Sequence, residues 1–514
     1  MVTSEDIKIL SIALNSIKLD EMFAIDPADG STDPVVQRNA GQNLEKTLGT
    51  NAPYITINGY NVTRSLLNFN LSLDGFLPTI RFSFAASDPV FISVNYPKDG
   101  DLVSVYMRSP ENYYKPFRMD FSVLTVSGGL SSEYSAEGID PEGRYFSFSI
   151  IAECHIPGLY AQRIKSFSQK TSWDTLLEVS QELNLGFSSN ESITNDVMSW
   201  ICPNYSYYDF IQEVSLRSYK DDETSFFDCW IDPYYNLNFV NLGKQFEFMG
   251  DPGDTAYYLP GYGEGGIKVD TAAPATPTPT VQDCPLVLTN QIGLGITPFF
   301  IRGYTLTSRA GNNTNGMGYI TTIGFYDDVA NVDTPDQKYV KYEIESITVE
   351  DVGENAILQK GRGRSNEYQE EKRKVWLGVL NRYEDGEGVH ENFLHAKYQN
   401  MININDCTKL CLEVSIGAYF PGIMRGQVIP VSIYVNDGGN RQQNVGNQKN
   451  GESNTSMTPT IDNFLSGNYV VTGIDVNWSA TSGGMKQTIR LSKRTWYANS
   501  SGSLPKAFPI SLQG

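Results

Sequence analysis

Beyond Pro53 the sequence is dominated by short runs in which apolar and polar residues alternate, each run ending at a turn signal. Alternation with a period of two is typical of strands that bury one face, whereas helices repeat every 3.6 residues. Asn58-Gly59, Lys98-Asp99-Gly100 and Gly128-Gly129 separate the runs, and glycine is frequent in tight turns. A composition with 30 Tyr, 25 Phe and 45 Gly also suits sheets and turns. We therefore expect an α+β protein that is mainly β.

A chain of 514 residues is too long for one hydrophobic core, since single cores stop growing at about 250 to 300 residues. Changes of pattern along the chain set the domain boundaries. They predict an N-terminal arm (1–52), a first tube-like β-barrel domain (53–165), an ααββ insert domain (166–245), a linker rich in Gly, Pro and Thr (246–282), a second tube-like β-barrel domain (283–496) with surface insertions at 353–400 and 436–457, and a C-terminal tail (497–514). The arm lacks a sustained period, and its apolar start could dock on a neighbour.

The insert domain is expected to begin with an amphipathic helix in TSWDTLLEVSQELNLG. Thr171 or Ser172 is its natural N-cap, and Gly186 is its C-terminal stop. The apolar face that the helical period predicts consists of Trp173, Leu176, Leu177 and Leu183.

A second helix is expected in SYYDFIQEVSLRSY, where Ser206 and Asp209 have the spacing of a capping box. Its buried stripe is predicted to be Phe210, Ile211 and Val214. The segments SFFDCWID and LNFVNL flank a turn and predict a β-hairpin. Two helices followed by a hairpin make the ααββ insert.

Two stretches far apart in the sequence look alike. Thr79–Phe84 is an alternating run, followed by a loop with proline and by Gly100, which leads into LVSVYM. Leu412–Ile416 is followed in the same way by a loop with Pro421 and by Gly426, which leads into VIPVSIYV. Any two β-hairpins share some features, so coincidence is an alternative. If the similarity is real, one chain carries two copies of one barrel.

The chain is acidic, because 39 Lys and Arg stand against 59 Asp and Glu, giving a formal net charge of -20. That balance argues against a protein whose whole surface binds nucleic-acid phosphates. An acidic surface could still line a passage through which DNA slides without sticking. The alternative is that the acidity serves only solubility.

Six cysteines, at positions 154, 202, 229, 284, 407 and 411, are too sparse for the disulfide framework of a secreted protein. Reduced thiols and assembly in a reducing cytosol are the simpler interpretation. The N-terminus has acidic residues where a signal peptide would be basic, and no apolar run reaches about 18 residues. We therefore expect neither an export signal nor a membrane span.

His390-Glu391 and His395 suggest a zinc-protease motif, but the second histidine lies at i+5, whereas HExxH needs i+4 for one helical face. Solvated loop histidines are the alternative. Cys407 and Cys411 could complete a four-ligand zinc site with either histidine, although structural zinc favours closer cysteine pairs. Buried strand cysteines are the simpler interpretation.

The segment GYGEGG at 261–266 fits a phosphate-binding pattern by letter, but it precedes a Pro/Thr linker and does not open a helix. One concentrated group of basic residues could dock an acidic partner or passing DNA, yet the glutamates among them favour a solvated face. It comprises Lys360, Arg362, Arg364, Lys372, Arg373 and Lys374. We predict no catalytic residue, no metal site and no cofactor.

Five segments have a recognisable pattern, namely RIKSFSQKTSWDTLLEVSQELNLGF (163–187), WICPNYSYYDFIQEVSLRSY (200–219), the DCWIDPYYNLNFVN hairpin, FLSGNYVVTGIDVNW and IRLSKRTW. They resemble the baseplate hub proteins of contractile-tailed bacteriophages, a family related to the hub domain of type VI secretion spike proteins. These stretches are spread over most of the chain between residues 53 and 496.

The resemblance implies a structural virion protein of the tail baseplate, assembled in the host cytoplasm. It implies a homotrimer in which two tube-like barrels per chain give a pseudo-sixfold ring, a symmetry adaptor between the sixfold tail tube and the threefold central spike. The implied partners are the tail tube protein, the central spike protein and the baseplate wedge proteins. DNA would pass through the ring during genome ejection without sequence-specific binding. The arm, the linker and the 353–400 insertion look like additions to the family's pattern.

Two other functions fit a β-rich chain. A tail-associated hydrolase of host cell wall or glycan would need a cleft with converging carboxylates or a metal. A receptor-binding tail protein would be expected to show fibre-like repeats, which the sequence lacks. Because nothing in the sequence singles out an acid pair, we expect a protein that is not an enzyme.

Overall fold

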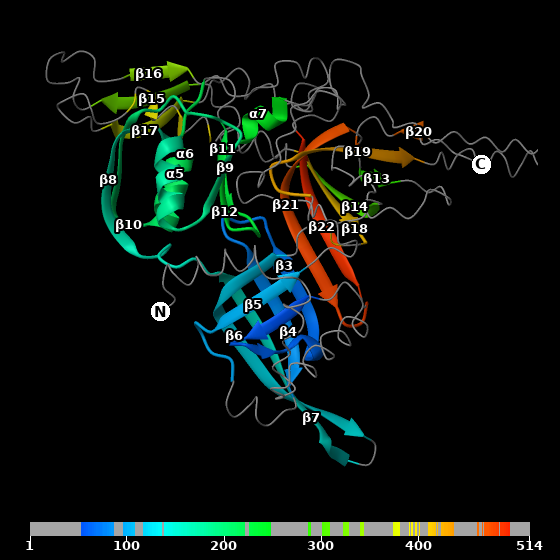
Figure 1. Cartoon of the computed structure of the whole chain (residues 1–514). Helices are drawn as coiled ribbons and strands as arrows, with labels where there is room; N and C mark the ends of the chain where they lie inside the picture. The colour runs from blue at the N-terminus through cyan, green and yellow to red at the C-terminus, as the bar shows by residue number, and fades with distance from the viewer. Residues whose placement is uncertain are drawn as a thin grey trace, which may run out of the picture.

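Figure 1 shows the computed structural model of the whole chain. The residues that it describes are 53–86, 96–107, 117–135, 138–221, 226–247, 286–288, 301–308, 322–327, 340–343, 374–380, 390, 392, 393, 396, 397, 400, 410–417, 419, 423–435, 460, 461, 465, 467–482 and 484–493. The predicted arm, the C-terminal tail, the polar loop at 436–457 and most of the linker and of the 353–400 insertion lie outside these residues.

One large sheet contains strands of both predicted β domains. Its path runs through β14 (Ile301–Ser308), β18 (Leu410–Ile416), β22 (Met485–Lys493), β21 (Gly467–Ser479), β3 (Leu66–Ser72), β4 (Thr79–Ala86), β7 (Gly138–Cys154), β6 (Phe117–Ser135), β5 (Leu102–Met107), β1 (Tyr54–Ile57) and β2 (Tyr60–Asn61). Three further strands extend it from β21, namely β19 (Val428–Val435), β13 (Leu286–Leu288) and β20 (Thr460–Ile461). The mainly β, α+β class is confirmed, and the regions predicted as two barrels share one continuous sheet.

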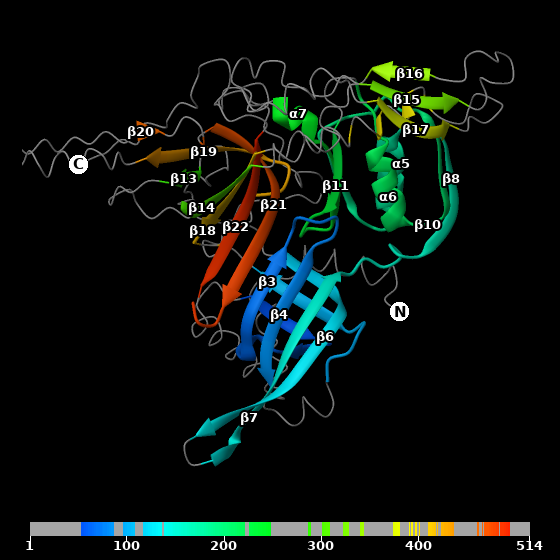
Figure 2. The same ribbon diagram turned by 180° about the vertical axis from the view of Figure 1, so that it is seen from behind.

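The two halves of this sheet meet where β21 lies beside β3. Figures 1 and 2 show the contact from opposite sides, with the blue and cyan strands β3 to β7 on one side and the orange and red strands β21 and β22 on the other. The insert, drawn in green, lies at the end of β3, where the backbone N–H of Ile231 donates to the carbonyl oxygen of Phe76 at 2.8 Å. Strands from distant parts of the sequence therefore form one curved layer.

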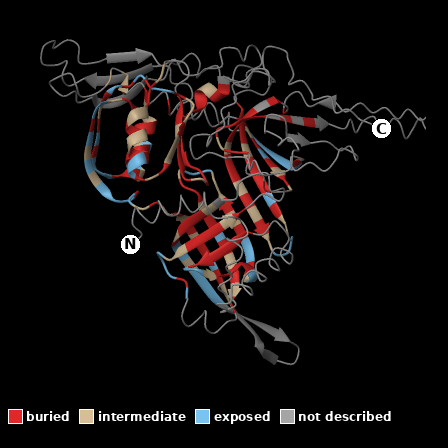
Figure 3. Cartoon of the chain, viewed as in Figure 1, coloured by how far each residue is buried: buried red, intermediate tan, exposed pale blue. Residues whose placement is uncertain are grey.

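Alternation along the strands separates a core face from a polar face. In β4, Ile80 and Phe82 are buried, while Arg81 between them is exposed. β18 alternates in the same way. The buried faces of both halves belong to one hydrophobic core, which appears as the red stripes along the strands in Figure 3. The period-two pattern of the sequence thus gives the core that it predicts.

The expectation that Gly128-Gly129 interrupts the strands is wrong. β6 continues through both glycines and pairs with β7 as far as Ser135. A Cβ atom at Gly128 would lie 3.1 Å from the ring of Phe148 on β7. Glycine therefore permits close packing of a neighbouring ring inside a strand at this position and does not end the strand.

The insert contains the predicted helices and the predicted hairpin. They are α5 (Ser172–Glu182), α6 (Tyr207–Leu216), β11 (Phe227–Ile231) and β12 (Asn236–Asn241). Four further elements were not expected from the sequence, namely β8 (Gln162–Lys170), β9 (Gly186–Ser189), β10 (Met198–Ser206) and α7 (Leu242–Glu247). β8 pairs with β10, and β9 joins β12 in parallel. β8 escapes a pattern search because Phe167 is the one residue of this strand that is buried.

Three strands within the range predicted for the second β domain (283–496) form a separate sheet. β15 (Thr322–Asp327) pairs with β16 (Val340–Glu343) in an antiparallel manner and with β17 (Lys374–Leu380) in parallel. In Figures 1 and 2 this sheet lies beside the insert. Alternation identifies a strand but not the sheet that it joins, because pairing across long sequence separations leaves no local pattern.

Both insert helices begin as predicted. The Oγ1 atom of Thr171 accepts a hydrogen bond from the backbone N–H of Asp174 at 3.1 Å, which makes Thr171 the N-cap. The Oγ atom of Ser206 accepts one from the backbone N–H of Asp209, also at 3.1 Å. Within the described part of the chain, no helix has the length and apolar character needed to cross a membrane.

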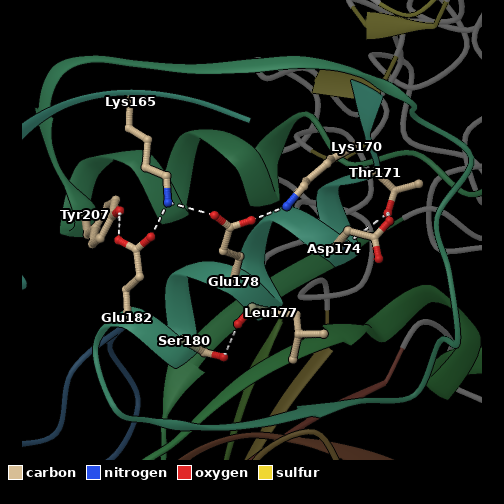
Figure 4. A network of polar contacts seen from close by, with 9 residues as sticks. All are labelled: Lys165, Lys170, Thr171, Asp174, Leu177, Glu178, Ser180, Glu182 and Tyr207. Carbon is tan, nitrogen blue, oxygen red and sulfur yellow. Dashed lines mark hydrogen bonds and ion pairs between the residues drawn. The ribbon is translucent and has the colours of Figure 1, made fainter. Parts of the chain in front are cut away.

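Figure 4 shows how α5 is fixed to its neighbours. Lys165 on β8 donates to Glu178 at 2.7 Å and also to Glu182, one turn further along α5. Lys170 donates to Glu178 as well, and the hydroxyl of Tyr207 on α6 donates to Glu182 at 2.5 Å. The hydrogen bonds from the two lysines lower the pKa of Glu178. This network joins β8, α5 and α6 into one unit.

Candidate assembly interface

The two halves of the large sheet repeat one strand arrangement. Repeat 1 comprises β3 to β7, and repeat 2 comprises β14, β18, β19, β21 and β22. In space the first has the order β3-β4-β7-β6-β5, and the second has the order β14-β18-β22-β21-β19. In both, the chain forms the first, second and fifth strands of this order and then returns through the fourth and third. The internal similarity expected from the sequence is confirmed.

The turn that leads into the fifth strand is the same in both repeats. The backbone N–H of Gly100 donates to the carbonyl oxygen of Val123 at 2.8 Å, and that of Gly426 donates to Val471 at 2.8 Å. The two glycines have φ angles of +79° and +85°, in the left-handed region that favours glycine. The resemblance between the repeats therefore extends to single hydrogen bonds.

The side chain after each of these glycines closes the turn. An oxygen of Asp101 accepts from the backbone N–H of Lys98 at 2.8 Å. The amide oxygen of Gln427 accepts from the backbone N–H of Met424 at 3.0 Å. A carboxylate and an amide thus make equivalent bonds, which a comparison of residue types would not reveal.

Irregularities in strand pairing also recur at equivalent places. Between the first and second strands, the register shifts after Leu66 in repeat 1 and after Ile301 in repeat 2. Between the third and fourth strands, it shifts after Val123 and after Val471. Bulges are specific features of a fold, so matching bulges align the two repeats residue by residue.

The repeats diverge beyond the fifth strand. In the first half, β1 runs antiparallel to β5. In the second half, β13 takes the equivalent place beside β19 but runs parallel to it. The shared unit therefore consists of five strands, and the strand outside it reaches its place by a different path.

The contact between the repeats, hereafter the seam, is the pairing of residues 475–479 of β21 with residues 68–72 of β3. On its core face, two pairs of apolar side chains oppose each other. They are Leu71 with Val476 and Phe69 with Trp478, and none of the four is more than 7% exposed. The seam therefore completes the core and is more than a loose contact between two domains.

The polar face of the seam is built mainly from uncharged side chains. The Nδ2 atom of Asn70 donates to Oδ1 of Asn477 across the seam at 2.9 Å. A hollow of ≈ 420 Å³ lies here. Its polar lining consists of Asn68, Asn70, Ser83, Ser149, Asn477, Ser479 and Ser482 with Arg81 and Lys486. The sequence suggested an acidic passage, but at this place the described lining has two basic side chains and no acidic one.

Arg425 connects the seam to the insert. Its Nη1 atom donates to the carbonyl oxygens of Asp74 at 2.8 Å and of Gly75 at 2.7 Å, just after β3. Its Nη2 atom pairs with Asp228 on β11. The guanidinium carbon also lies 4.8 Å from the ring centre of Trp230. One side chain of repeat 2 thus holds repeat 1 and the insert together.

A second arginine stabilises the end of the seam. Arg490 on β22 pairs with Asp74 and with Asp475. Burial raises the pKa of Asp74, but the hydrogen bond from Ser72 and the charge of Arg490 outweigh it, so this pKa lies below its usual value. A Cβ atom at Gly473 would lie 2.7 Å from the Cβ of Asp74. Glycine is therefore required where the bulge of β21 approaches this acid.

Two matching strand edges have no partner among the described residues. β14 pairs on one side with β18, and its exposed residues include Tyr304 at 42% and Leu306 at 37%. β6 pairs with β5 only as far as Ser122, and from there to Ser135 its described partner is β7 alone. The equivalent part of β21 is the part that pairs with β3 in the seam.

Of the zinc-protease-like pattern at 390–395, whose histidine spacing argued against a metal site, the structure describes His390. His390 packs against the rings of Trp200, Tyr219 and Phe393, with ring centres 5.8 to 6.4 Å apart. Burial lowers the pKa of His390 to about 4. The description of this residue as a solvated loop histidine is therefore wrong. The rest of its motif, Glu391 and His395, lies outside the described residues.

The other candidate ligands are also separated or outside the described residues. The Sγ atom of Cys411 lies 3.7 Å from Oγ of Ser492, whereas Cys407 is not described. In the part of the chain that the structure describes, no three His, Cys, Asp or Glu side chains gather to hold a metal ion. The segment 261–266 is not described, and of the basic group only Lys374 is, as the first residue of β17. Thiols outside any disulfide include the buried Cys154, Cys202 and Cys229.

A cleft of ≈ 510 Å³ beside Arg425 is lined by Asp74, Asp209, Glu213 and Asp228, and Asp74 pairs with Arg490. Each of them has a structural partner. Asp209 accepts from the N-cap hydroxyl of α6 at 2.6 Å, and Glu213 pairs with Arg217 one turn further on. Asp228 pairs with Arg425. The cleft therefore offers no pair of carboxylates that is set apart for acid–base chemistry.

No protein-family model matches the sequence, and no curated protein matches it. Solved structures similar to this chain do exist. The tail protein from Neisseria meningitidis MC58 has a TM-score of 0.44 and 9% identity, over 88% of this chain and 98% of its own. The 43 kDa tail protein of prophage MuSo2 from Shewanella oneidensis has a TM-score of 0.43 and 9% identity, over 86% and 98%.

A further similar structure is a component of the type VI secretion system of E. coli, described as structurally similar to T4 bacteriophage tail proteins. Its TM-score is 0.35 with 9% identity, over 88% of this chain and 80% of its own. These three similar structures are thus described as two tail proteins and one type VI secretion component. TM-scores below 0.5 establish no function.

Proposed function

We propose that this protein is a structural component of a virus-like contractile tail and forms the central hub of its baseplate. In this role three copies make a pseudo-sixfold ring that joins the tail tube to the central spike. Its partners are the tail tube protein, the spike protein and the baseplate wedge proteins. The proposal assigns the chain no reaction and no cofactor.

The observation that supports the proposal most strongly is the repeated five-strand unit. A ring closes when one side of each unit fits the opposite side of the next unit. This chain supplies two such units and already contains one contact between them, the seam. Three chains would therefore give six units joined by three seams and three contacts between copies.

The number of copies follows from the resemblance of the sequence to hub proteins. A ring of six similar units from three chains can face a sixfold tube on one side and a threefold spike on the other. A repeat within one chain is what such an adaptor needs, because identical units alone would carry only one of the two symmetries.

In this proposal the polar face of the sheet lines the channel, since the opposite face is buried in the core. At the seam this face carries amide and hydroxyl groups with two isolated basic residues, Arg81 and Lys486. Binding of DNA depends on many cations that contact phosphates. Such a wall would let DNA pass without sequence-specific binding.

Light scattering of the purified protein, followed by averaged electron images, tests the proposal. We expect particles of three copies with an open centre. Images of a complex with the tail tube and spike proteins should show these on opposite faces of the ring. A monomer that lyses peptidoglycan or capsule would favour the hydrolase, and a monomer that binds host cells would favour the receptor-binding protein.

A further inference from the structure

We infer that β14 of one copy pairs with β6 of the next copy in the register of the seam. This inference rests on the proposed ring and adds the residues through which its copies bind. The partner is a second copy of this chain, and the contact is an antiparallel continuation of the large sheet. Two strand edges that are separate in one copy would then complete each other.

The register follows from the alignment of the repeats. Counted from the matching bulges, Thr305 of β14 is equivalent to Asn70 of β3. Gly129 of β6 is equivalent to Asn477 of β21 in the same way. Asn70 and Asn477 oppose each other in the seam, so Gly129 should oppose Thr305 of the next copy. The segments that would pair are 127–131 and 303–307.

The side chains of β14 match those that the seam buries. β3 has an aromatic residue and a leucine, Phe69 and Leu71, which are 2% and 0% exposed. β14 has an aromatic residue and a leucine at the equivalent positions, Tyr304 and Leu306, which are 42% and 37% exposed. Apolar side chains on an unpaired edge strand favour pairing with another chain. β14 therefore has the side chains needed to pair with a strand equivalent to β21, as β3 does in the seam.

The opposing strand has room for such a partner. Ser127, Gly128 and Gly129 are exposed. A Cβ atom built at Gly129 meets nothing within 4 Å, and the same holds for Gly303 on β14. Because β6 beyond Ser122 pairs with β7 alone among the described strands, its other edge is open to a neighbouring strand.

Paired cysteines test the register. Cys411 lies on β18, next to β14, so it is first replaced in the variant Cys411→Ser to remove a competing thiol. Gly129→Cys and Thr305→Cys are then introduced together. After oxidation we expect covalent dimers and trimers on a non-reducing gel, and their loss on reduction. Each single variant should give only monomers, because a neighbouring copy then offers no opposing thiol.

Two controls make the result decisive. Asn70→Cys with Asn477→Cys, in the same background, should close a disulfide inside each chain and so show that the seam geometry permits the bond. Gly129→Cys with Tyr304→Cys places the thiols on opposite faces and should give no ladder. Light scattering is measured on every variant. The inferred register is wrong if the protein is trimeric and Asn70→Cys with Asn477→Cys forms its internal disulfide, but Gly129→Cys with Thr305→Cys gives no covalent dimers or trimers. It is also wrong if Gly129→Cys with Tyr304→Cys gives as many covalent dimers and trimers as the pair with Thr305→Cys. If light scattering shows that the parent protein and all variants are monomers, the proposed ring is wrong.

Discussion

The seam inside the chain and the outer edge of β14, which has no partner among the described residues, have the same strand arrangement but differ in what covers them. Phe69 and Leu71 in β3 are buried against β21, whereas Tyr304 and Leu306 at the equivalent positions of β14 are exposed. Local sequence therefore determines where a strand forms and which of its sides is apolar. Whether that side is buried depends on whether another strand packs beside it. The comparison can be tested by perturbing matched positions in the two places.

The largest expected effect is at the seam. Leu71→Ala removes a fully buried side chain and should lower the free energy of unfolding by about 3 kcal/mol, because it leaves a cavity. The matched change Leu306→Ala should cost less than about 0.5 kcal/mol in the isolated chain. Urea unfolding of dilute protein measures both. Equal losses would show that β14 is already covered within one copy.

Arg425→Met should cost between about 2 and 3 kcal/mol, since it leaves two carbonyl oxygens and Asp228 without their charged donor. The equivalent residue of repeat 1 is Asp99, which is exposed. Asp99→Ala should therefore change the free energy of unfolding by less than about 0.5 kcal/mol. If the two variants unfold alike, Arg425 does not hold the seam and the insert together.

Acid should destabilise the insert, because His390 packs against Trp200 of the insert. The pKa of His390 in the folded chain is about 4, below the value of an exposed histidine, so the unfolded chain binds the proton first. Stability is therefore full above about pH 6.5 and decreases as the pH falls towards 4, with about 2 kcal/mol lost between pH 7 and 5.

The fluorescence of Trp200, which packs against His390, reports this change when unfolding is measured at each pH. His390→Phe keeps an aromatic ring but cannot bind a proton, so most of the pH dependence in this range should disappear. A pH dependence that is unchanged in this variant would assign it to other groups.

The smallest expected effect tests whether the two turns are equivalent. Gly100→Ala and Gly426→Ala should each cost about 1 kcal/mol, because both positions have positive φ angles. Gly129→Ala should cost less than about 0.5 kcal/mol, since its Cβ would lie in open space. Unequal losses at Gly100 and Gly426 would weaken the repeat at the level of single turns.

Much of this fold follows from local patterns. The N-caps Thr171 and Ser206 and the buried stripe of α6 were predictable because one side chain and one helical period define them. The stripe of α5 was predicted only in part, since it buries Val179 and leaves Leu177 half-buried. The repeat was visible because in both halves an alternating run is followed by a loop with proline and then by a glycine, Gly100 or Gly426, that leads into the next strand. These features depend on neighbours in the sequence.

The remaining features depend on distant neighbours. β8 was missed because Phe167 is its one buried residue, so the strand has no buried face for a sequence pattern to indicate. Gly128 was misread because its reason is the ring of Phe148 on another strand. Arg425 had no signal at all, since its partners Asp74 and Asp228 lie far away in the sequence. Long-range pairing therefore sets the limit of what the sequence reveals about the candidate interface.

Electron cryomicroscopy of the assembled particle, at a resolution that separates neighbouring strands, tests the central claim most directly. We expect a sheet that continues from copy to copy, with β14 beside β6 of the next copy and a contact that resembles the seam at six places around the ring. A ring in which β14 faces solvent, or in which another segment covers it, would contradict the claim that the seam is the template for assembly.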